Sequence, residues 1–242
     1  MKSSVRLFPS PAELAARLGE EIVRRISISA TRERGYSIAL SGGSTPELLY
    51  SFLAEGYSFS VPWEFVYIFW GDERCVPVNH ADSNYGMVRR ILLDKIGIPA
   101  ANVFRMRGEE NPVLEAARYS CELSAILPSR NGLPVFDLVL LGLGKDGHTA
   151  SIFPGNLRLL TADIVCGIAE HPVNKQRRIS ISGSAINNAE AVVFLASGKD
   201  KAQVVKDILR KSPGSENYPA SHIKPVYGSL DWFLDTEAGS LL

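Results

Sequence analysis

The chain has 242 residues, 45% of them hydrophobic, which is enough for a substantial core in one large α/β domain or two small ones. Its 26 lysines and arginines equal its 26 aspartates and glutamates, so the overall charge gives no reason to expect a nucleic-acid or membrane partner, and any cationic site must be local. Three widely spaced cysteines without C-x-x-C spacing predict free thiols, and with no leader sequence and no apolar run long enough to cross a bilayer we expect a cytoplasmic protein.

The first predicted element is a helix that begins after Ser10. In the stretch SPAE, Ser10 is the predicted N-cap, Pro11 takes the first helical position and Glu13 completes a capping box. Apolar residues then recur at helical spacing, at Leu14, Leu18, Ile22 and Ile26. We expect this amphipathic helix to cover a sheet.

Short apolar runs alternate with helical patterns through the rest of the chain. The runs that predict strands cover residues 36–41, 63–70, 136–143, 178–182 and 191–197. The helical patterns cover residues 46–56, 83–97, 111–127 and 200–211. This alternation predicts an α/β fold with a largely parallel sheet and helices on both faces. No repeat or linker divides residues 1–242, so we expect one domain.

Ligands of such sheets bind beyond the carboxyl ends of the strands, and the first distinctive loop there is SGGSTP. Its glycines allow backbone N–H groups to approach an anion, its hydroxyls add donors, and the following helix N-terminus contributes positive potential. No Gly-Lys-Ser/Thr follows, which argues against a nucleotide triphosphate. The loop predicts either a phosphate site, formed by Gly42, Gly43, Ser44 and Thr45, or a tight turn with a Ser/Thr cap.

The second loop, WGDERCVP, places three charged residues at the end of a strongly apolar strand. Arg74 could form a forked contact with a phosphate, while a carboxylate such as Asp72 orients the arginine or binds a substrate hydroxyl. The alternative is a solvated charged turn, which is the commoner arrangement where strands end.

The third loop, GLGKDGHTASIFPG, has two interpretations. Its glycines match G-x-G-x-x-G, the dinucleotide-binding fingerprint, but that fingerprint requires a sustained helix and an acid after the next strand. Here a proline and a glycine interrupt the chain, and Asp163 follows no convincing strand, so we reject an NAD site. The loop instead places Asp146 and His148 where the carboxylate can orient the imidazole, although a histidine that only caps the turn is the structural alternative.

Other site types fit the sequence less well. His80, His148, His171 and His222 show none of the close pairings typical of zinc sites, and there is no G-x-S-x-G elbow of a serine hydrolase. The segment 156–176 is weakly patterned, so it predicts neither how this segment closes over a substrate nor a role for His171. The sequence also predicts no oligomeric state.

Several long motifs, in order along the chain, resemble the 6-phosphogluconolactonase family. They are SGGSTP, WGDERCVP followed by SNYG, LGLGKDGHTASIFPG and RRISISGSAINNAEAVVFLASGKDKA, and the resemblance extends to the terminal PASHIKP and LDWFLD segments. It implies a Rossmann-like α/β fold shared with glucosamine-6-phosphate deaminases. It also implies hydrolysis of 6-phospho-D-glucono-1,5-lactone, a small sugar phosphate, in the oxidative pentose phosphate pathway.

The resemblance further implies roles for individual residues. His148 would remove a proton from the water that attacks the lactone carbonyl, and Asp146 would support it. The phosphate would lie against the SGGSTP loop, with Arg74 and Lys201 supplying charge, whereas Arg177 and Arg178 fit a positive field or a structural role equally well. A lactone is already an activated ester, so a positioned water, a base and oxyanion stabilisation suffice without a metal or organic cofactor.

Two other functions fit parts of the sequence. The related deaminases carry a glutamate five residues after the histidine, where this chain has Phe153, which cannot transfer a proton. A non-catalytic sugar-phosphate sensor is possible on the same fold, since fold does not fix function. The neutral 242-residue chain shows no attached DNA-binding segment, and the presence of Asp146 with His148 favours catalysis.

Overall fold

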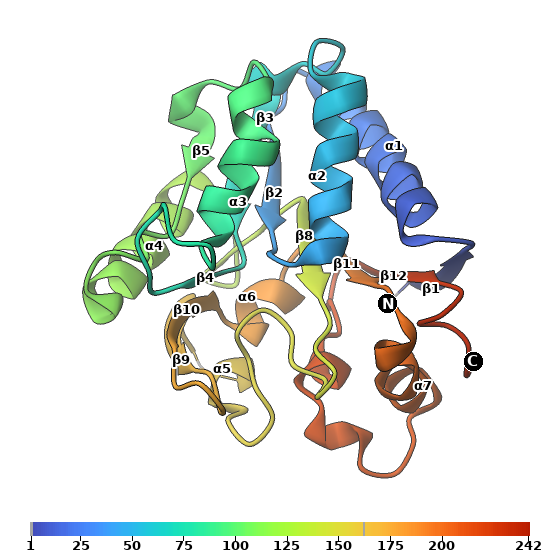
Figure 1. Cartoon of the computed structure of the whole chain (residues 1–242). Coiled ribbons are helices and arrows are strands. Elements are labelled where there is room, and N and C mark those ends of the chain that lie inside the picture. The colour runs from blue at the N-terminus through green and yellow to red at the C-terminus, as the bar shows by residue number, and fades with distance from the viewer. Residues whose placement is uncertain (1, 162) are drawn as a thin grey trace.

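A computed structural model of the chain describes residues 2–161 and 163–242. Its centre is a seven-stranded sheet in which all neighbouring strands run parallel, in the order β1–β12–β11–β8–β2–β3–β5 (Figure 1). The strands are β1 (Lys2–Phe8), β2 (Tyr36–Leu40), β3 (Val66–Trp70), β5 (Val103–Phe104), β8 (Leu138–Gly142), β11 (Ala191–Ala196) and β12 (Ser229–Asp235). The predicted α/β fold with a largely parallel sheet is confirmed.

Helices cover both faces of this sheet. The α-helices of the described residues are α1 (Pro11–Ala30), α2 (Ser44–Tyr57), α3 (Asn84–Ile91), α4 (Pro112–Ile126), α5 (Arg158–Thr161), α6 (Gly183–Asn187) and α7 (Ala202–Arg210). Helices α1, α2 and α3 pack side by side (Figure 1). Short 3₁₀ turns occupy Trp63–Phe65, Leu93–Lys95, Ala100–Asn102, Lys199–Lys201, Ser215–Asn217 and Pro219–His222.

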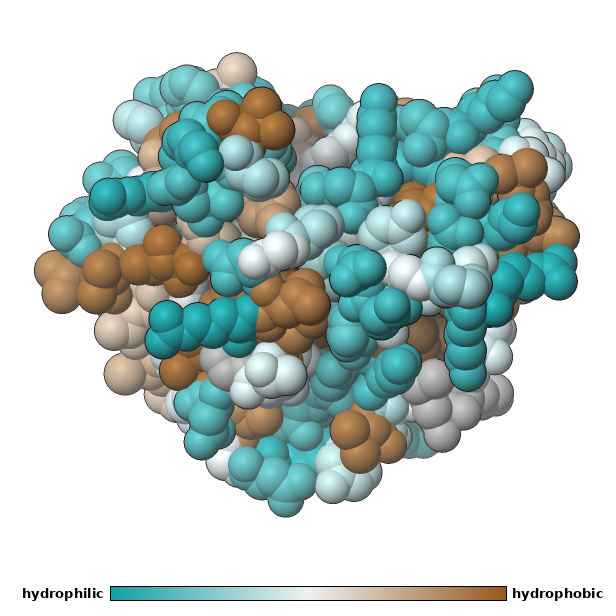
Figure 2. Space-filling model, turned by 90° about the horizontal axis from the view of Figure 1, so that it is seen from below, coloured by the Kyte–Doolittle hydropathy of each residue, from teal (hydrophilic) through white to brown (hydrophobic). Residues whose placement is uncertain are grey.

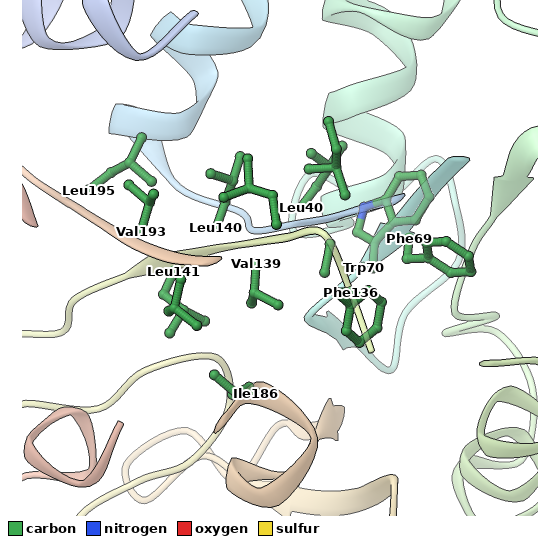
Figure 3. Packing of buried hydrophobic residues seen from close by; sticks show 14 of the residues in the cluster. Leu40, Phe69, Trp70, Phe136, Val139, Leu140, Leu141, Ile186, Val193 and Leu195 are labelled. Atoms are coloured by element: carbon green, nitrogen blue, oxygen red, sulfur yellow. The ribbon is translucent and has the colours of Figure 1, made fainter. Parts of the chain in front are cut away.

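The core lies on both sides of the central strands, which are buried along their whole length. In Figure 3, Leu140 and Val193 point to the side of the sheet on which α2 lies, whereas Leu141 points to the opposite side, toward Ile186 of α6. This alternation follows from the period of two along a strand. Because both faces are covered, these strands are continuously apolar, as in other parallel sheets.

Helix α1 forms as its sequence predicts. The hydroxyl of Ser10 accepts a hydrogen bond from the backbone N–H of Glu13 at 3.2 Å, and Pro11 is the first helical residue. The predicted apolar stripe is buried at Leu14, Leu18, Ile22 and Ile26.

The predicted strand at 178–182 exists but does not join the parallel sheet. It is β10 (Arg177–Ile181), which pairs antiparallel with β9 (Cys166–Glu170) and β4 (Asp72–Arg74) in a separate three-stranded sheet. Only a short turn joins β9 to β10, and a short turn permits antiparallel pairing but no parallel crossover. A two-stranded sheet of β6 (Ser129–Arg130) and β7 (Leu133–Pro134) completes the strands of the described residues.

Candidate active site

A cavity of about 340 Å³ lies where β2, β8 and β11 end, beside β4 and β10. Figure 2 shows the molecule from the side at which the parallel strands end, where hydrophilic residues are interspersed with small groups of hydrophobic ones. The residues of the predicted site that line the cavity are Gly42, Gly43, Ser44, Thr45, Asp72, Arg74, His148 and Lys201. Asp146 is not part of the lining but contacts His148 from behind.

The SGGSTP loop leaves the N-terminus of α2 open to the cavity. Gly43 is the N-cap residue, with a φ of +111°, and no side chain caps the helix. The hydroxyl of Thr45 is instead hydrogen-bonded to that of Ser197, 2.7 Å away, at the end of β11. The Ser/Thr-capped turn is therefore not what forms here, and the first N–H groups of a 14-residue helix face a site suited to an anion.

Three cationic side chains approach the cavity from different elements. Arg74 follows β3 and donates from Nη1 to the backbone carbonyl of Asp82 at 2.8 Å, and Lys201 lies at the start of α7 with its side chain 19% exposed. The third is Arg178 of β10, which is only 8% exposed. Burial, and then the nearby charge of Arg74, lower the pKa of Arg178. Like charges gathered at one cavity favour an anionic ligand.

Arg178 is the residue whose role the sequence left open, and the structure puts it in the cavity wall while its neighbour Arg177 lies outside the lining and is exposed. Successive residues of a strand face opposite ways, so only one of the two arginines can face the cavity, but the strand pattern does not show which face of β10 lies toward it. Asn84, in the SNYG motif, is a second lining residue to which the sequence gave no role.

Two carboxyl groups of the WGDERCVP loop are buried, so the loop is not a solvated turn. Asp72 accepts a hydrogen bond from the hydroxyl of Ser151 at 2.6 Å and lies 3.9 Å from Nη1 of Arg178, not beside Arg74. Glu73 accepts backbone N–H bonds from Arg74, Asn84 and Tyr85 at 2.7–2.8 Å. Burial raises the pKa of Glu73 to about 7 despite these hydrogen bonds.

His148 and Asp146 form a tight pair. Nδ1 of His148 lies 2.6 Å from Oδ1 of Asp146, and the backbone N–H of His148 donates to the same oxygen at 3.2 Å. Burial opposes ionisation of Asp146, but the hydrogen bond and charge of His148 outweigh it and lower the pKa of Asp146 to about 2. An ionised carboxylate can only accept a hydrogen bond, so Nδ1 of His148 carries the proton in this pair.

Gly144 makes this pair possible. A Cβ atom at Gly144 would lie 2.0 Å from Nδ1 of His148 and 2.5 Å from Oδ1 of Asp146. The glycine pattern that resembles a dinucleotide fingerprint therefore has a different cause, which is the close approach of the histidine and aspartate to the backbone.

No metal centre is evident in the described residues, and two of the three cysteines are held as thiols by burial. Among them, no group of three or more His, Cys, Asp or Glu side chains could hold a metal ion. Burial raises the pKa of Cys75 to about 11 and of Cys166 to about 12, so both remain thiols near neutral pH. None of the helices in residues 2–161 and 163–242 is long and apolar enough to cross a membrane.

Comparison with known proteins gives the same answer as the motifs. The family model of glucosamine-6-phosphate isomerases/6-phosphogluconolactonases matches residues 9–232. The chain is 39% identical to a 6-phosphogluconolactonase from Haemophilus influenzae over 236 residues, covering 97% of this chain and 98% of that one. It is 37% identical to the 6-phosphogluconolactonase of Rattus norvegicus, covering 98% and 93%.

Solved structures agree with these relatives. The 6-phosphogluconolactonase from Trypanosoma brucei superposes with a TM-score of 0.89 at 33% identity, covering 100% of this chain and 99% of that one. A monomeric glucosamine-6-phosphate deaminase, at 21% identity and a TM-score of 0.79, shares the fold. The chain belongs to the glucosamine-6-phosphate isomerase/6-phosphogluconolactonase family.

Proposed function

We propose that the protein hydrolyses 6-phospho-D-glucono-1,5-lactone to 6-phospho-D-gluconate, in the oxidative pentose phosphate pathway. The observation that carries the proposal is the His148–Asp146 pair, 2.6 Å apart, at the wall of a cavity with three cationic side chains. The 6-phosphogluconolactonases at 34–42% identity support the same substrate. The chain acts as one domain, in the cytoplasm, on a small molecule and without a nucleic-acid partner.

The phosphate binds at the N-terminus of α2, against the SGGSTP loop. Arg74, Arg178 and Lys201 supply its counter-charge, and the loop N–H groups supply hydrogen bonds. Binding at this non-reacting end of the sugar orients the carbonyl toward His148 and so contributes to the rate. The buried carboxylate of Asp72 has Oδ2 occupied by Ser151, and Oδ1 accepts a hydrogen bond from a sugar hydroxyl.

Hydrolysis then proceeds by base catalysis without a covalent intermediate. Nε2 of His148 removes a proton as water attacks the lactone carbonyl, and Asp146 stabilises the imidazolium that forms. The tetrahedral intermediate collapses with cleavage of the bond from the carbonyl carbon to the ring oxygen. The imidazolium returns its proton to that oxygen, which leaves the free acid and a regenerated base.

The deaminase alternative lacks a proton-transfer group at the position where it is needed. The fifth residue after His148 is Phe153, which is 2% exposed and surrounded by core residues. An aromatic hydrocarbon cannot replace a carboxylate in ring opening. This departure favours the lactonase over the deaminase.

The deciding experiment is the initial rate of lactone hydrolysis, corrected for the spontaneous reaction. Wild type should accelerate hydrolysis, and His148→Ala should lose on the order of a hundredfold or more at matched folded concentration. His222→Ala is the control, because His222 is only partly exposed but lies outside the cavity lining, where its Nε2 is bonded to the backbone carbonyl of Glu216. If wild type binds the sugar phosphate without accelerating hydrolysis, the proposal fails, and ammonia release from glucosamine 6-phosphate is measured next.

A further inference from the structure

One aromatic ring lies behind the cavity wall and contacts two of its functional groups. The ring centroid of Phe153 is 4.9 Å from that of His148, and its plane is tilted by 46°. The guanidinium carbon of Arg178 lies 5.7 Å from the same centroid. His171 packs edge-on against the ring at 5.2 Å. His148 and Arg178 line the cavity, whereas Phe153 and His171 do not.

The local backbone holds this ring rigidly. A tight turn joins Thr149 to Ile152, whose backbone N–H donates to the carbonyl of Thr149 at 2.9 Å, with Ala150 in the left-handed region at a φ of +47°. Within the turn, Ser151 donates its hydroxyl to Asp72. The turn reverses the chain, so that Phe153 lies beneath the histidine that precedes it by five residues.

The base needs a second contact besides Asp146. The hydrogen bond to Nδ1 fixes one edge of the imidazole but not the angle of its plane, since terminal sp³–sp² torsions such as χ2 of histidine have broad minima. Contact with the buried ring of Phe153 restricts that angle. Nε2 is thereby aimed at one place in the cavity, which is a requirement for proton transfer from water.

Arg178 depends on the ring for a different reason. Its Nε is buried without a hydrogen-bond partner among the described residues, and the carboxylate of Asp72 is 3.9 Å from Nη1. The face of an aromatic ring attracts a guanidinium within about 6 Å. The guanidinium has one long hydrogen bond, from Nη2 to Oε1 of Gln176 at 3.4 Å, so Phe153 adds a second contact that supports its orientation.

We propose that Phe153 is a positioning residue shared by the base and the anion-binding arginine, and that its ring sets the spacing between them. The inference rests on the proposed function, because this spacing must match the distance from the phosphate to the lactone carbonyl. It gives the residue at this position a role beyond filling the core.

The test compares Phe153→Leu with Phe136→Leu by steady-state kinetics at matched folded concentration. Phe136 is equally buried but precedes β8, at the opposite end of that strand from the cavity, so its truncation affects stability alone. Phe153→Leu should lower kcat about tenfold and raise KM severalfold, while Phe136→Leu leaves both unchanged. Phe153→Met, whose unbranched side chain adapts to irregular space better than leucine but also lacks an aromatic face, should show the same loss and replaces the leucine variant if that does not fold.

Two further measurements separate positioning from general damage. The first uses a His148→Ala background, with enough enzyme that the catalysed rate exceeds the spontaneous rate of hydrolysis. There, Phe153→Leu should cause no further loss of kcat, because the base that it positions is gone. The affinity for inorganic phosphate, measured by calorimetry, should fall severalfold in Phe153→Leu and stay constant in Phe136→Leu.

The outcomes that overturn the proposal are specific. The first is an unchanged kcat in Phe153→Leu. The second is that Phe153→Leu lowers kcat by the same factor with and without His148, and the third is that Phe136→Leu lowers kcat as much as Phe153→Leu does. Failure of the proposed function can be told apart from failure of this proposal. A wild-type protein that does not hydrolyse the lactone refutes the proposed function. The phosphate affinity can be measured without turnover, and an affinity unchanged in Phe153→Leu refutes the role of Phe153.

Discussion

Two acidic side chains of the site region have pKa values shifted in opposite directions. Asp146 is half-exposed and bonded to a histidine, which lowers its pKa to about 2, whereas Glu73 is 1% exposed and has a pKa raised to about 7. The difference follows from which influence dominates, a nearby positive partner or burial. Asp146 therefore stays ionised near neutral pH, as the proposed support of His148 requires, whereas the ionisation of Glu73 makes the stability of the fold depend on pH.

Asp146→Asn should lower turnover much more than stability. The amide can donate to Nδ1 of His148, which favours the tautomer protonated on Nε2 and removes the base. We expect kcat to fall on the order of tenfold to a hundredfold, with KM and the urea midpoint nearly unchanged. Asp94→Asn, on an exposed turn after α3, is the control and should retain wild-type kcat. Full activity of Asp146→Asn would refute the supporting role of the carboxylate.

Glu73→Gln should remove a pH-dependent part of the stability. The pKa of Glu73 in the folded protein, about 7, lies above its ordinary value of 4.5, so its stabilising contribution is complete below pH 4.5 and is lost as the pH rises through 7. The free energy of unfolding of wild type minus that of the variant should therefore fall by on the order of 3 kcal/mol between pH 4.5 and 8. Urea unfolding at several pH values measures this difference, and a difference independent of pH would contradict the assignment.

At the scale of elements, the N-termini of α2 and α3 meet through Gly42 and Asn84. The side chain of Asn84 donates to the backbone carbonyl of Asp72 at 2.9 Å, and a Cβ atom at Gly42 would lie 1.9 Å from its Oδ1. Glycine at position 42 thus lets the SGGSTP loop pack against the loop that carries Asp72 and Arg74.

Gly42→Ala should weaken both substrate binding and the fold, because the added methyl group must displace the buried side chain of Asn84. We expect KM to rise at least severalfold and stability to fall by about 1–3 kcal/mol. The matched control is Gly56→Ala within α2, where an added Cβ atom meets nothing within 4 Å. This substitution should stabilise the helix by about 0.5–1 kcal/mol. Kinetics and urea unfolding of the two variants distinguish a local clash from a general effect of alanine.

The elements that the sequence predicts well are those with a local signal. Helix α1 has a cap, a proline and an apolar stripe within 17 residues, and β8 is a continuous apolar run bounded by turns. Strand β1 (Lys2–Phe8) has no such signal, since it depends on pairing with β12 more than 200 residues away. Strand β4 has only three residues, and its pairing with β10 is equally non-local.

The candidate site can be predicted from the sequence where its residues belong to a local motif, but not where the tertiary fold alone brings a residue to the cavity. His148, Asp146 and the SGGSTP loop are recognisable from residue types and spacing. The sequence does not reveal the place of Arg178 in the cavity wall, because that place depends on β10 leaving the parallel sheet. It does not reveal Asn84 either, because the side chain of Asn84 packs against a glycine of another loop.

At the scale of the whole molecule, a chain with no net charge concentrates positive charge at one edge of its sheet. The lining of the cavity includes three cationic side chains, Arg74, Arg178 and Lys201, against the two carboxylates of Asp72 and Asp200. The parallel topology brings the loops after β2, β3, β8 and β11 to the same edge, and β10 of the separate three-stranded sheet adds Arg178. An anion that binds here should therefore stabilise the whole fold, since it binds the native state and not the unfolded chain.

Inorganic phosphate should raise the Tm of the wild-type protein. At phosphate concentrations above the Kd, the rise should grow with the logarithm of the phosphate concentration. At a hundredfold excess over Kd the stabilisation is about 2.7 kcal/mol, which for a domain of this size corresponds to a rise of several degrees. Lys201→Ala should reduce this rise at every phosphate concentration, because Lys201 lines the cavity at the start of α7. Lys206→Ala is the matched control, since it lies on the same helix outside the lining and should keep the wild-type response. Thermal unfolding in chloride of equal ionic strength removes the general effect of salt, and an equal phosphate response in both variants would exclude Lys201 from the anion site.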